Sequence, residues 1–201
     1  MITRRQGWRL LLGILAAWLL AQAVLLPPTA VAGHWRQAET QSMALNLAHR
    51  GFEPLMPRIN WGGDGPGYVE AELPLYQCLV APLLRLSGDA EWPGMAVSLA
   101  CIALTAMVFY AMAERRFGPA AALVGAVYVL TSRLGVHLST AVMPDSMVAL
   151  LYVVALERFL VWARGRRLAP LLASAVALGV AGCIKPTALG LGIAEFGIVV
   201  W

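Results

Sequence analysis

Acidic side chains are scarce in this 201-residue chain, and most of them collect in one part of it. Of the eleven acids, eight lie between residues 39 and 91 or at residue 145: Glu39, Glu53, Asp64, Glu70, Glu72, Asp89, Glu91 and Asp145. Glu39, Glu70, Glu72 and Asp145 each stand at the end of an apolar stretch, where a carboxylate is partly removed from water. Such a carboxylate is suited to proton transfer or ligand binding. The other four are predicted to be ordinary loop charges.

The elements that must position these acids are apolar runs. The chain is 60% hydrophobic and 13% charged, against roughly 25% charged in soluble domains, and its mean hydropathy is +0.71. Most runs approach the ~17–25 residues that cross a bilayer as a helix. They lie near 10–26, 93–113, 119–136, 146–163, 168–184 and 187–201. We therefore predict an all-α polytopic membrane protein with about six transmembrane helices, the last cut short, and we interpret residues 1–201 as the N-terminal part of one transmembrane domain.

Basic residues predict the orientation, because Lys and Arg near short loops stay on the cytoplasmic side. Three arginine clusters fall on one side: residues 4–9, 115–116 and 158–167. The N-terminus is then cytoplasmic, and residues 33–92 form a long first extracytoplasmic loop. A cleaved signal peptide ending near Ala32 is the alternative for the first run. The net charge of +4 reflects this anchoring and gives no reason to expect nucleic acid as a partner.

The long loop is predicted to contain two interfacial helices. The first begins near Arg36 and stops at Gly51, with Ala38, Leu45, Ala48 and Phe52 on one stripe. A glycine-rich loop follows. The stretch "LPLYQCLVAPLLRLSG" is apolar but too short to span a bilayer, which favours a second helix in the interface.

Four stretches carry a resemblance to a known family. They are "RQAETQSMALNLAHRGFEPLMPRI", "GYVEAELPLYQCLVAPLLRLSG", "MPDSMVALLYVVALERFL" and "IKPTAL". In this order and spacing the chain resembles the N-terminal half of membrane glycosyltransferases of family 39, which share the GT-C fold and include protein O-mannosyltransferases. The resemblance implies an inverting enzyme that moves a sugar from a polyprenyl-phosphate donor to a lipid, glycan or protein acceptor on the extracytoplasmic side.

The resemblance also implies roles for residues of the long loop. Glu39 matches the acid that acts as general base on the acceptor hydroxyl; the alternative is an ion pair with Arg36, three residues earlier. Arg36 is itself a candidate for substrate binding. Glu72, with Glu70 as its neighbour, matches a charged position just before the Pro-Leu-Tyr run that contains Tyr76, and all three are candidate substrate-binding residues.

Three further candidates lie at the ends of later runs. A departing phosphate needs fixed cations, and Lys185, the only lysine, and Arg133 are the choices; for both the alternative is snorkelling at the interface. Asp145 is either a helix-start residue or a site carboxylate, with a divalent metal ion as a possible cofactor there. No other cofactor is expected.

Two other functions remain open from sequence. A transporter or flippase of lipid-linked sugars would share the topology, but it would place its polar residues near mid-membrane. A non-catalytic membrane protein is the second alternative. Richness in Arg, Ala, Leu and Gly beside a single Lys suggests a bacterial inner (plasma) membrane.

Overall fold

The structure is a computed structural model that describes residues 2–25, 35–61, 63, 65–90 and 92–200. These residues form helices and no strand. In chain order the helices are α1 (Arg4–Leu25), α2 (Trp35–His49), α3 (Leu75–Ser87), α4 (Trp92–Thr131), α5 (Arg133–Thr140), α6 (Asp145–Gly165), α7 (Leu168–Ile184), a 3₁₀ turn (Pro186–Ala188) and α8 (Leu189–Val200). The predictions for Asp64, Glu91 and a cleavage site near Ala32 fall outside the described residues.

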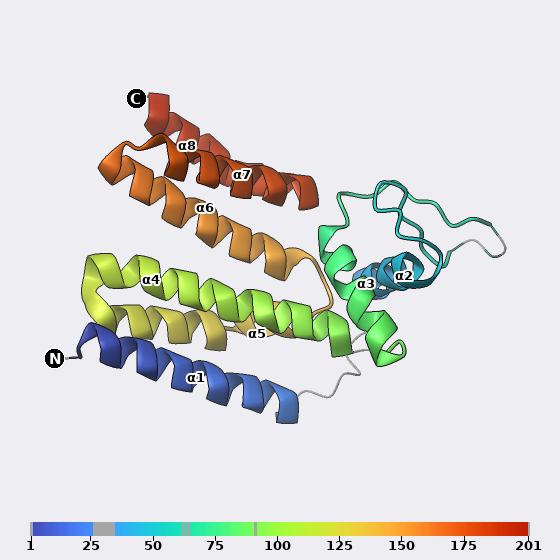
Figure 1. Ribbon diagram of the computed structural model, residues 1–201, viewed down its shortest axis with the longest axis horizontal. Helices are drawn as coiled ribbons and strands as arrows, with labels where there is room; N and C mark the ends of the chain where they lie inside the picture. Colours follow the sequence, from blue (N-terminus) through green and yellow to red (C-terminus); the bar gives the residue numbers. More distant parts are fainter. Residues whose placement is uncertain (1, 26–34, 62, 64, 91, 201) are drawn as a thin grey trace.

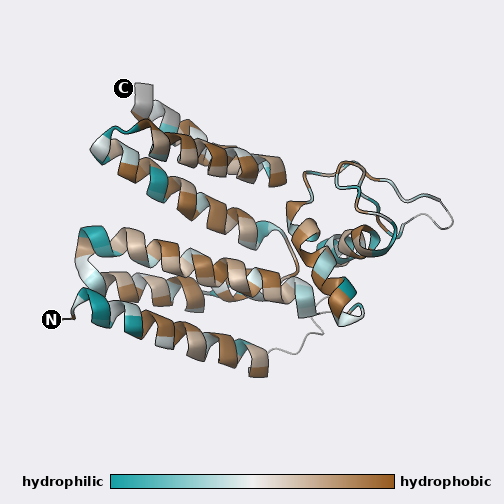
Figure 2. Ribbon diagram, in the orientation of Figure 1, coloured by the Kyte–Doolittle hydropathy of each residue, from teal (hydrophilic) through white to brown (hydrophobic). Residues whose placement is uncertain are grey.

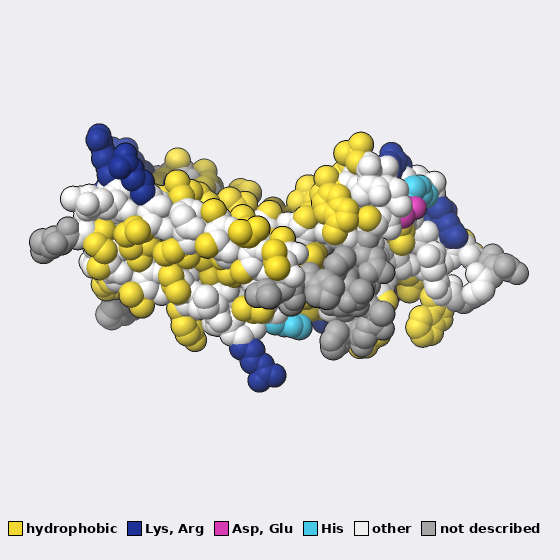
Figure 3. All heavy atoms as spheres, turned by 90° about the horizontal axis from the view of Figure 1, so that it is seen from below, with side chains coloured by type: hydrophobic (Ala, Val, Ile, Leu, Met, Phe, Trp, Pro, Cys, Tyr) yellow, Lys and Arg dark blue, Asp and Glu magenta, His cyan; other side chains and the backbone are white. Residues whose placement is uncertain are grey.

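The longer helices lie side by side in a bundle, and α2 and α3 pack across one end of it (Figure 1). The helices α1, α4 and α6 are long and apolar enough to cross a membrane, and α7 is a shorter apolar helix. Figure 2 shows apolar residues along the bundle and hydrophilic ones gathered at the far end from α2 and α3. Apolar side chains also cover the flank seen in Figure 3. The chain is an all-α polytopic membrane protein.

The helix α4 consists of two legs that fold back on each other. Gly118 has φ 80° and ψ 168° in the middle of it, a backbone conformation that glycine adopts without a steric penalty, and Pro119 starts the second leg. Phe109 of the first leg lies against Gly125 of the second. The predicted apolar runs 93–113 and 119–136 are therefore two legs, but the second ends at Thr131. Ser132 then caps α5 by accepting a hydrogen bond from the Gly135 amide (3.1 Å).

The two predicted interfacial helices are present as α2 and α3. Gly51 (φ 118°) follows α2 and Gly88 (φ 65°) ends α3, both in conformations that favour glycine. The four residues of the predicted apolar stripe of α2 do not form a buried face, since Ala38 and Phe52 are exposed. The helix instead buries a face that mixes polar and apolar side chains: Gln37, Thr40, Gln41, Met43, Ala44, Asn46, Leu47 and Ala48.

One hydrophobic core joins this end layer to the bundle. Leu47 of α2, Val80 and Leu84 of α3, Met147 of α6 and Ile184 of α7 belong to the same buried cluster. For the side chains of the end layer, Leu47, Val80 and Leu84, removal from water stabilises the fold by about 1.5–3 kcal/mol each. The ends of α6 and α7 are therefore packed against the α2–α3 layer, and the candidate site lies at this junction.

Candidate active site

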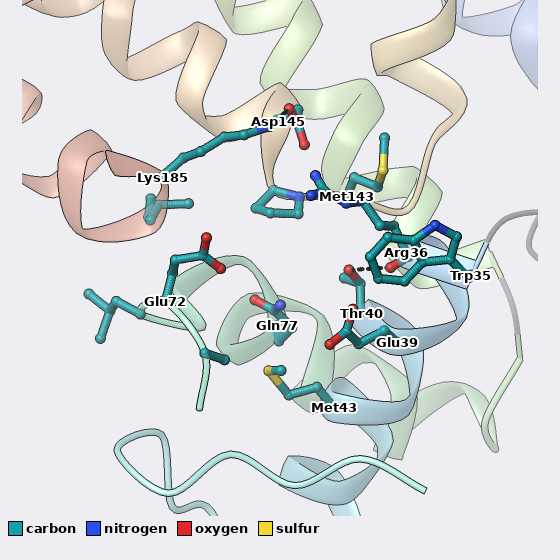
Figure 4. Close-up of a pocket in the computed structure, with 14 residues that line it drawn as sticks. Trp35, Arg36, Glu39, Thr40, Met43, Glu72, Gln77, Met143, Asp145 and Lys185 are labelled. Atoms are coloured by element: carbon teal, nitrogen blue, oxygen red, sulfur yellow. Dashed lines mark hydrogen bonds and ion pairs between the residues drawn. The ribbon is translucent and has the colours of Figure 1, made fainter. Parts of the chain in front are cut away.

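A cavity of about 130 Å³ lies where α2 and the segment before α3 meet the start of α6 and the end of α7 (Figure 4). Its walls come from segments more than a hundred residues apart in the chain. The predicted site residues that line it are Arg36, Glu39, Glu72, Asp145 and Lys185.

Lys185 and Asp145 form an ion pair across the top of this cavity as drawn in Figure 4. Asp145 lies in the first turn of α6, after Pro144, where the helix dipole stabilises a carboxylate. Lys185 follows the last residue of α7 in extended backbone. Both side chains are about two-thirds to three-quarters buried. The two alternatives for Asp145 are thus not exclusive, because it begins a helix and also lines the cavity.

A backbone hydrogen bond places Glu72 in the same cavity. The amide of Leu73 donates to the carbonyl oxygen of Cys183 at 3.0 Å, which fastens the segment before α3 to the end of α7. Glu72 therefore lines the cavity together with Lys185, two residues beyond Cys183. Figure 4 shows its carboxylate on the opposite wall from Glu39.

Glu39 is positioned by the first turns of α2. The side-chain oxygen of Gln37 accepts a hydrogen bond from the Val142 amide (3.0 Å), which ties α2 to the segment before α6. Glu39 is half-buried on the cavity side. Among the described residues it forms no ion pair, so the predicted alternative of an Arg36–Glu39 pair is not found. The Arg36 guanidinium lies over the Trp35 ring, 5.3 Å from its centroid.

Three predicted site residues do not line the cavity. Tyr76 is fully buried, and its hydroxyl donates to the Gly94 carbonyl oxygen (2.6 Å) and lies 2.8 Å from Ser98 Oγ. Burial raises the pKa of Tyr76, so the hydroxyl stays protonated as a structural donor between α3 and α4. Glu70 is an exposed loop residue, and Arg133 is exposed at the start of α5. The structure therefore gives no support to substrate contacts by these three.

Sequence reasoning missed Gln77. It is 7% exposed and lines the cavity, and its Oε1 atom is buried without a hydrogen-bond partner among the described residues. Buried polar atoms are seldom unpartnered in native proteins, and the residue lines the cavity, so the Gln77 side-chain amide is a candidate ligand contact. The one available signal was an amide inside the apolar stretch "LPLYQCLV".

The prediction of a divalent ion at Asp145 stays a prediction. Within the described ranges no group of three His, Cys, Asp or Glu side chains is close enough to share a metal ion. Asp145 is paired with Lys185 instead.

Together the fold and the cavity define a polytopic membrane protein whose acids and cations converge where the bundle meets the two short helices α2 and α3. Residues 70–201 match the family model described as dolichyl-phosphate-mannose-protein mannosyltransferase, and the chain belongs to this family. Membership implies a membrane glycosyltransferase, as the sequence motifs predicted. The matched range contains Glu72, Asp145 and Lys185, whereas Arg36 and Glu39 precede it. Comparisons with curated proteins and with solved structures gave no significant match.

Proposed function

We propose that the protein transfers a sugar from a polyprenyl-phosphate donor to a hydroxyl group of a lipid, glycan or protein acceptor on the extracytoplasmic side. The observation that carries this proposal is the convergence of Glu39, Glu72, Asp145 and Lys185 on one cavity in a member of a mannosyltransferase family. The apolar flank of the bundle offers a surface for the prenyl chain (Figure 3).

In this proposal the acceptor oxygen attacks the anomeric carbon from the side opposite the phosphate. The new carbon–oxygen bond forms as the bond from this carbon to the phosphate oxygen breaks, which inverts the anomeric centre. The hydroxyl proton passes to the carboxylate of Glu39, because a hydroxyl is a poor nucleophile until a base within hydrogen-bond reach accepts its proton.

The donor leaves as polyprenyl phosphate and takes the bonding electron pair with it. Negative charge therefore grows on the phosphate, and positive groups fixed beforehand stabilise it. Lys185 and Arg36 are the cations that line the cavity. Asp145 holds the Lys185 ammonium at the cavity wall. In this proposal Glu72 and Gln77, which line the same cavity, bind sugar hydroxyls.

Replacing Glu39 by Gln in the full-length protein tests the proposal. The amide keeps the side-chain shape but cannot accept the proton, so we expect sugar transfer to fall by about a hundredfold or more. Transfer is measured with a labelled polyprenyl-phosphate sugar after reconstitution. The control is Glu53→Gln, an exposed acid that pairs with Arg58 away from the cavity, and it should retain activity. Full activity of a correctly inserted Glu39→Gln protein would contradict the role of Glu39.

The alternatives predict other behaviour. A transporter of lipid-linked sugars is expected to hold its polar residues near mid-membrane, whereas the charged cavity here lies at the end of the bundle. A non-catalytic protein would show no sugar transfer, and replacing Glu39, Asp145 or Lys185 would change its stability at most. The position of the cavity supports the transferase.

A further inference from the structure

A second cavity, of about 350 Å³, is lined by residues of α4, α6 and α7. They come from the region of the α4 fold-back and of the turn between α6 and α7, which lie at the end of the bundle away from α2 and α3 (Figure 1). Four guanidinium groups line it, from Arg115, Arg116, Arg164 and Arg167. Glu157 is the one carboxylate in its wall. The cavity therefore carries an excess of positive charge.

Glu157 offsets only one of the four positive charges, and both of its oxygens are already bound by guanidinium groups. It is 4% exposed, and it accepts from Arg115 Nη1 at 2.5 Å and from Arg158, which lies outside the cavity lining. Two guanidinium groups thus supply the hydrogen bonds and the opposite charge that a buried carboxylate needs. Its role is to fix Arg115 at the wall.

The other three arginines keep their charge available. Arg116, Arg164 and Arg167 make no ion pair with any carboxylate among the described residues; Arg116 donates only to the Met112 carbonyl oxygen (3.4 Å). Arg166 (φ 48°) ends α6. The chain reverses there, and Arg164 and Arg167 on either side of the turn reach the same cavity.

The surroundings of the cavity fit the depth of lipid headgroups. Phe117 and Leu168, the neighbours of Arg116 and Arg167, are 72% and 64% exposed, as expected for apolar side chains that meet lipid. Leu160 and Val161 add apolar wall inside the cavity. A ligand suited to this site has a phosphate anion at one end and hydrocarbon at the other. Basic pockets between membrane helices bind such headgroups.

We propose that this cavity binds the phosphate headgroup of an anionic phospholipid from the leaflet at the arginine-rich end of the bundle. Arg116, Arg164 and Arg167 contact the phosphate as charge-assisted donors, and the site is separate from the sugar-transfer cavity. The inference does not depend on the proposed function.

A pair of matched double variants of the full-length protein tests this inference. R164Q/R167Q removes two charges from the cavity and leaves Arg115 to pair with buried Glu157. R5Q/R9Q removes two charges from exposed positions on α1 that do not line the cavity. Purified protein in detergent is titrated with phosphatidylglycerol, with phosphatidylcholine and with inorganic phosphate. Retained lipid is counted by native mass spectrometry, and the midpoint of thermal unfolding is recorded.

We expect phosphatidylglycerol to bind and to raise the unfolding midpoint, with affinity roughly tenfold or more lower in R164Q/R167Q. In R5Q/R9Q the affinity should stay within about twofold of the unmodified protein, because only long-range attraction is lost. Equal losses in both variants would overturn the site, since they would indicate attraction to surface charge alone. Equal binding of phosphatidylcholine would also overturn it. Stabilisation by inorganic phosphate at the concentration that suffices for the lipid would overturn the lipid assignment.

Discussion

At the scale of single residues, a comparison of Gln77 with Gln41 separates a ligand-binding role from a simple packing defect. Its Oε1 atom is buried without a partner among the described residues, and so is Oε1 of Gln41 on α2, which does not line the cavity. An unpartnered buried acceptor costs about 1–3 kcal/mol, so replacing it by an apolar group of similar shape is neutral or stabilising. The unpartnered oxygen therefore lowers the stability of the fold by a similar amount at both residues, but of the two only Gln77 lines the cavity.

Replacing Gln77 by Leu is predicted to leave the stability of the protein unchanged or slightly raised. KM for the sugar donor should rise about tenfold, which corresponds to the loss of one hydrogen bond of about 1.4 kcal/mol. Thermal unfolding and steady-state kinetics on the full-length protein measure the two effects. Gln41→Leu is the matched control, with the same stability effect and an unchanged KM. A normal KM in Gln77→Leu would remove this residue from the site.

The candidate acids could be predicted from sequence only as a set of positions at one side of the membrane. Counting the crossings between arginine clusters put Glu39, Asp145 and Lys185 on the same side, and the structure brings them to one cavity. The sequence motif already favoured Glu72 over Glu70, but the Leu73–Cys183 hydrogen bond that holds Glu72 at the cavity joins segments 110 residues apart. No local pattern encodes such a contact.

At the scale of elements, the Lys185–Asp145 pair joins the end of α7 to the start of α6. Replacing Lys185 by Met leaves a largely buried carboxylate without its cation, so we predict a loss of about 1–2 kcal/mol in unfolding free energy together with a loss of sugar transfer. Adding Asp145→Asn should recover most of the stability without recovering transfer, because the cation for the phosphate is still missing. Recovery of both, measured by unfolding and by transfer assays, would assign the pair a purely structural role.

The bounds of the short helices were predictable because local residues end them. Gly51 and Gly88 adopt positive φ after α2 and at the end of α3. This conformation ends a right-handed helix, and glycine adopts it without a steric penalty. The buried face of α2 was not predictable, because its polar members are paired across long distances. Gln37 accepts from Val142, and the Asn46 amide donates to the carbonyl oxygen of Arg58 (3.0 Å). Apolar periodicity carries no information about such partners.

At the scale of the whole molecule, charge is divided between the two ends of the bundle. The start of α1, the fold-back at Gly118 and the turn between α6 and α7 lie together at the end away from α2 and α3 (Figure 1). An ion pair between Arg4 and Glu114 (3.4 Å) connects the first two of these. Nine of the fifteen basic residues lie at this end: Arg4, Arg5, Arg9, Arg115, Arg116, Arg158, Arg164, Arg166 and Arg167.

This division predicts the orientation of the protein, because a cytoplasmic excess of Arg and Lys sets the topology of membrane helices. The orientation is tested in a variant whose own three cysteines are replaced by alanine. One new cysteine is introduced at a time, either at Leu55, which is 85% exposed in the loop between α2 and α3, or at Gly165, at the end of α6. A membrane-impermeant maleimide should label Leu55→Cys in right-side-out vesicles and Gly165→Cys only in inverted ones. The opposite pattern would place the Glu39 cavity in the cytoplasm and contradict extracytoplasmic sugar transfer, whereas activity of Glu39→Gln would contradict the catalytic role alone.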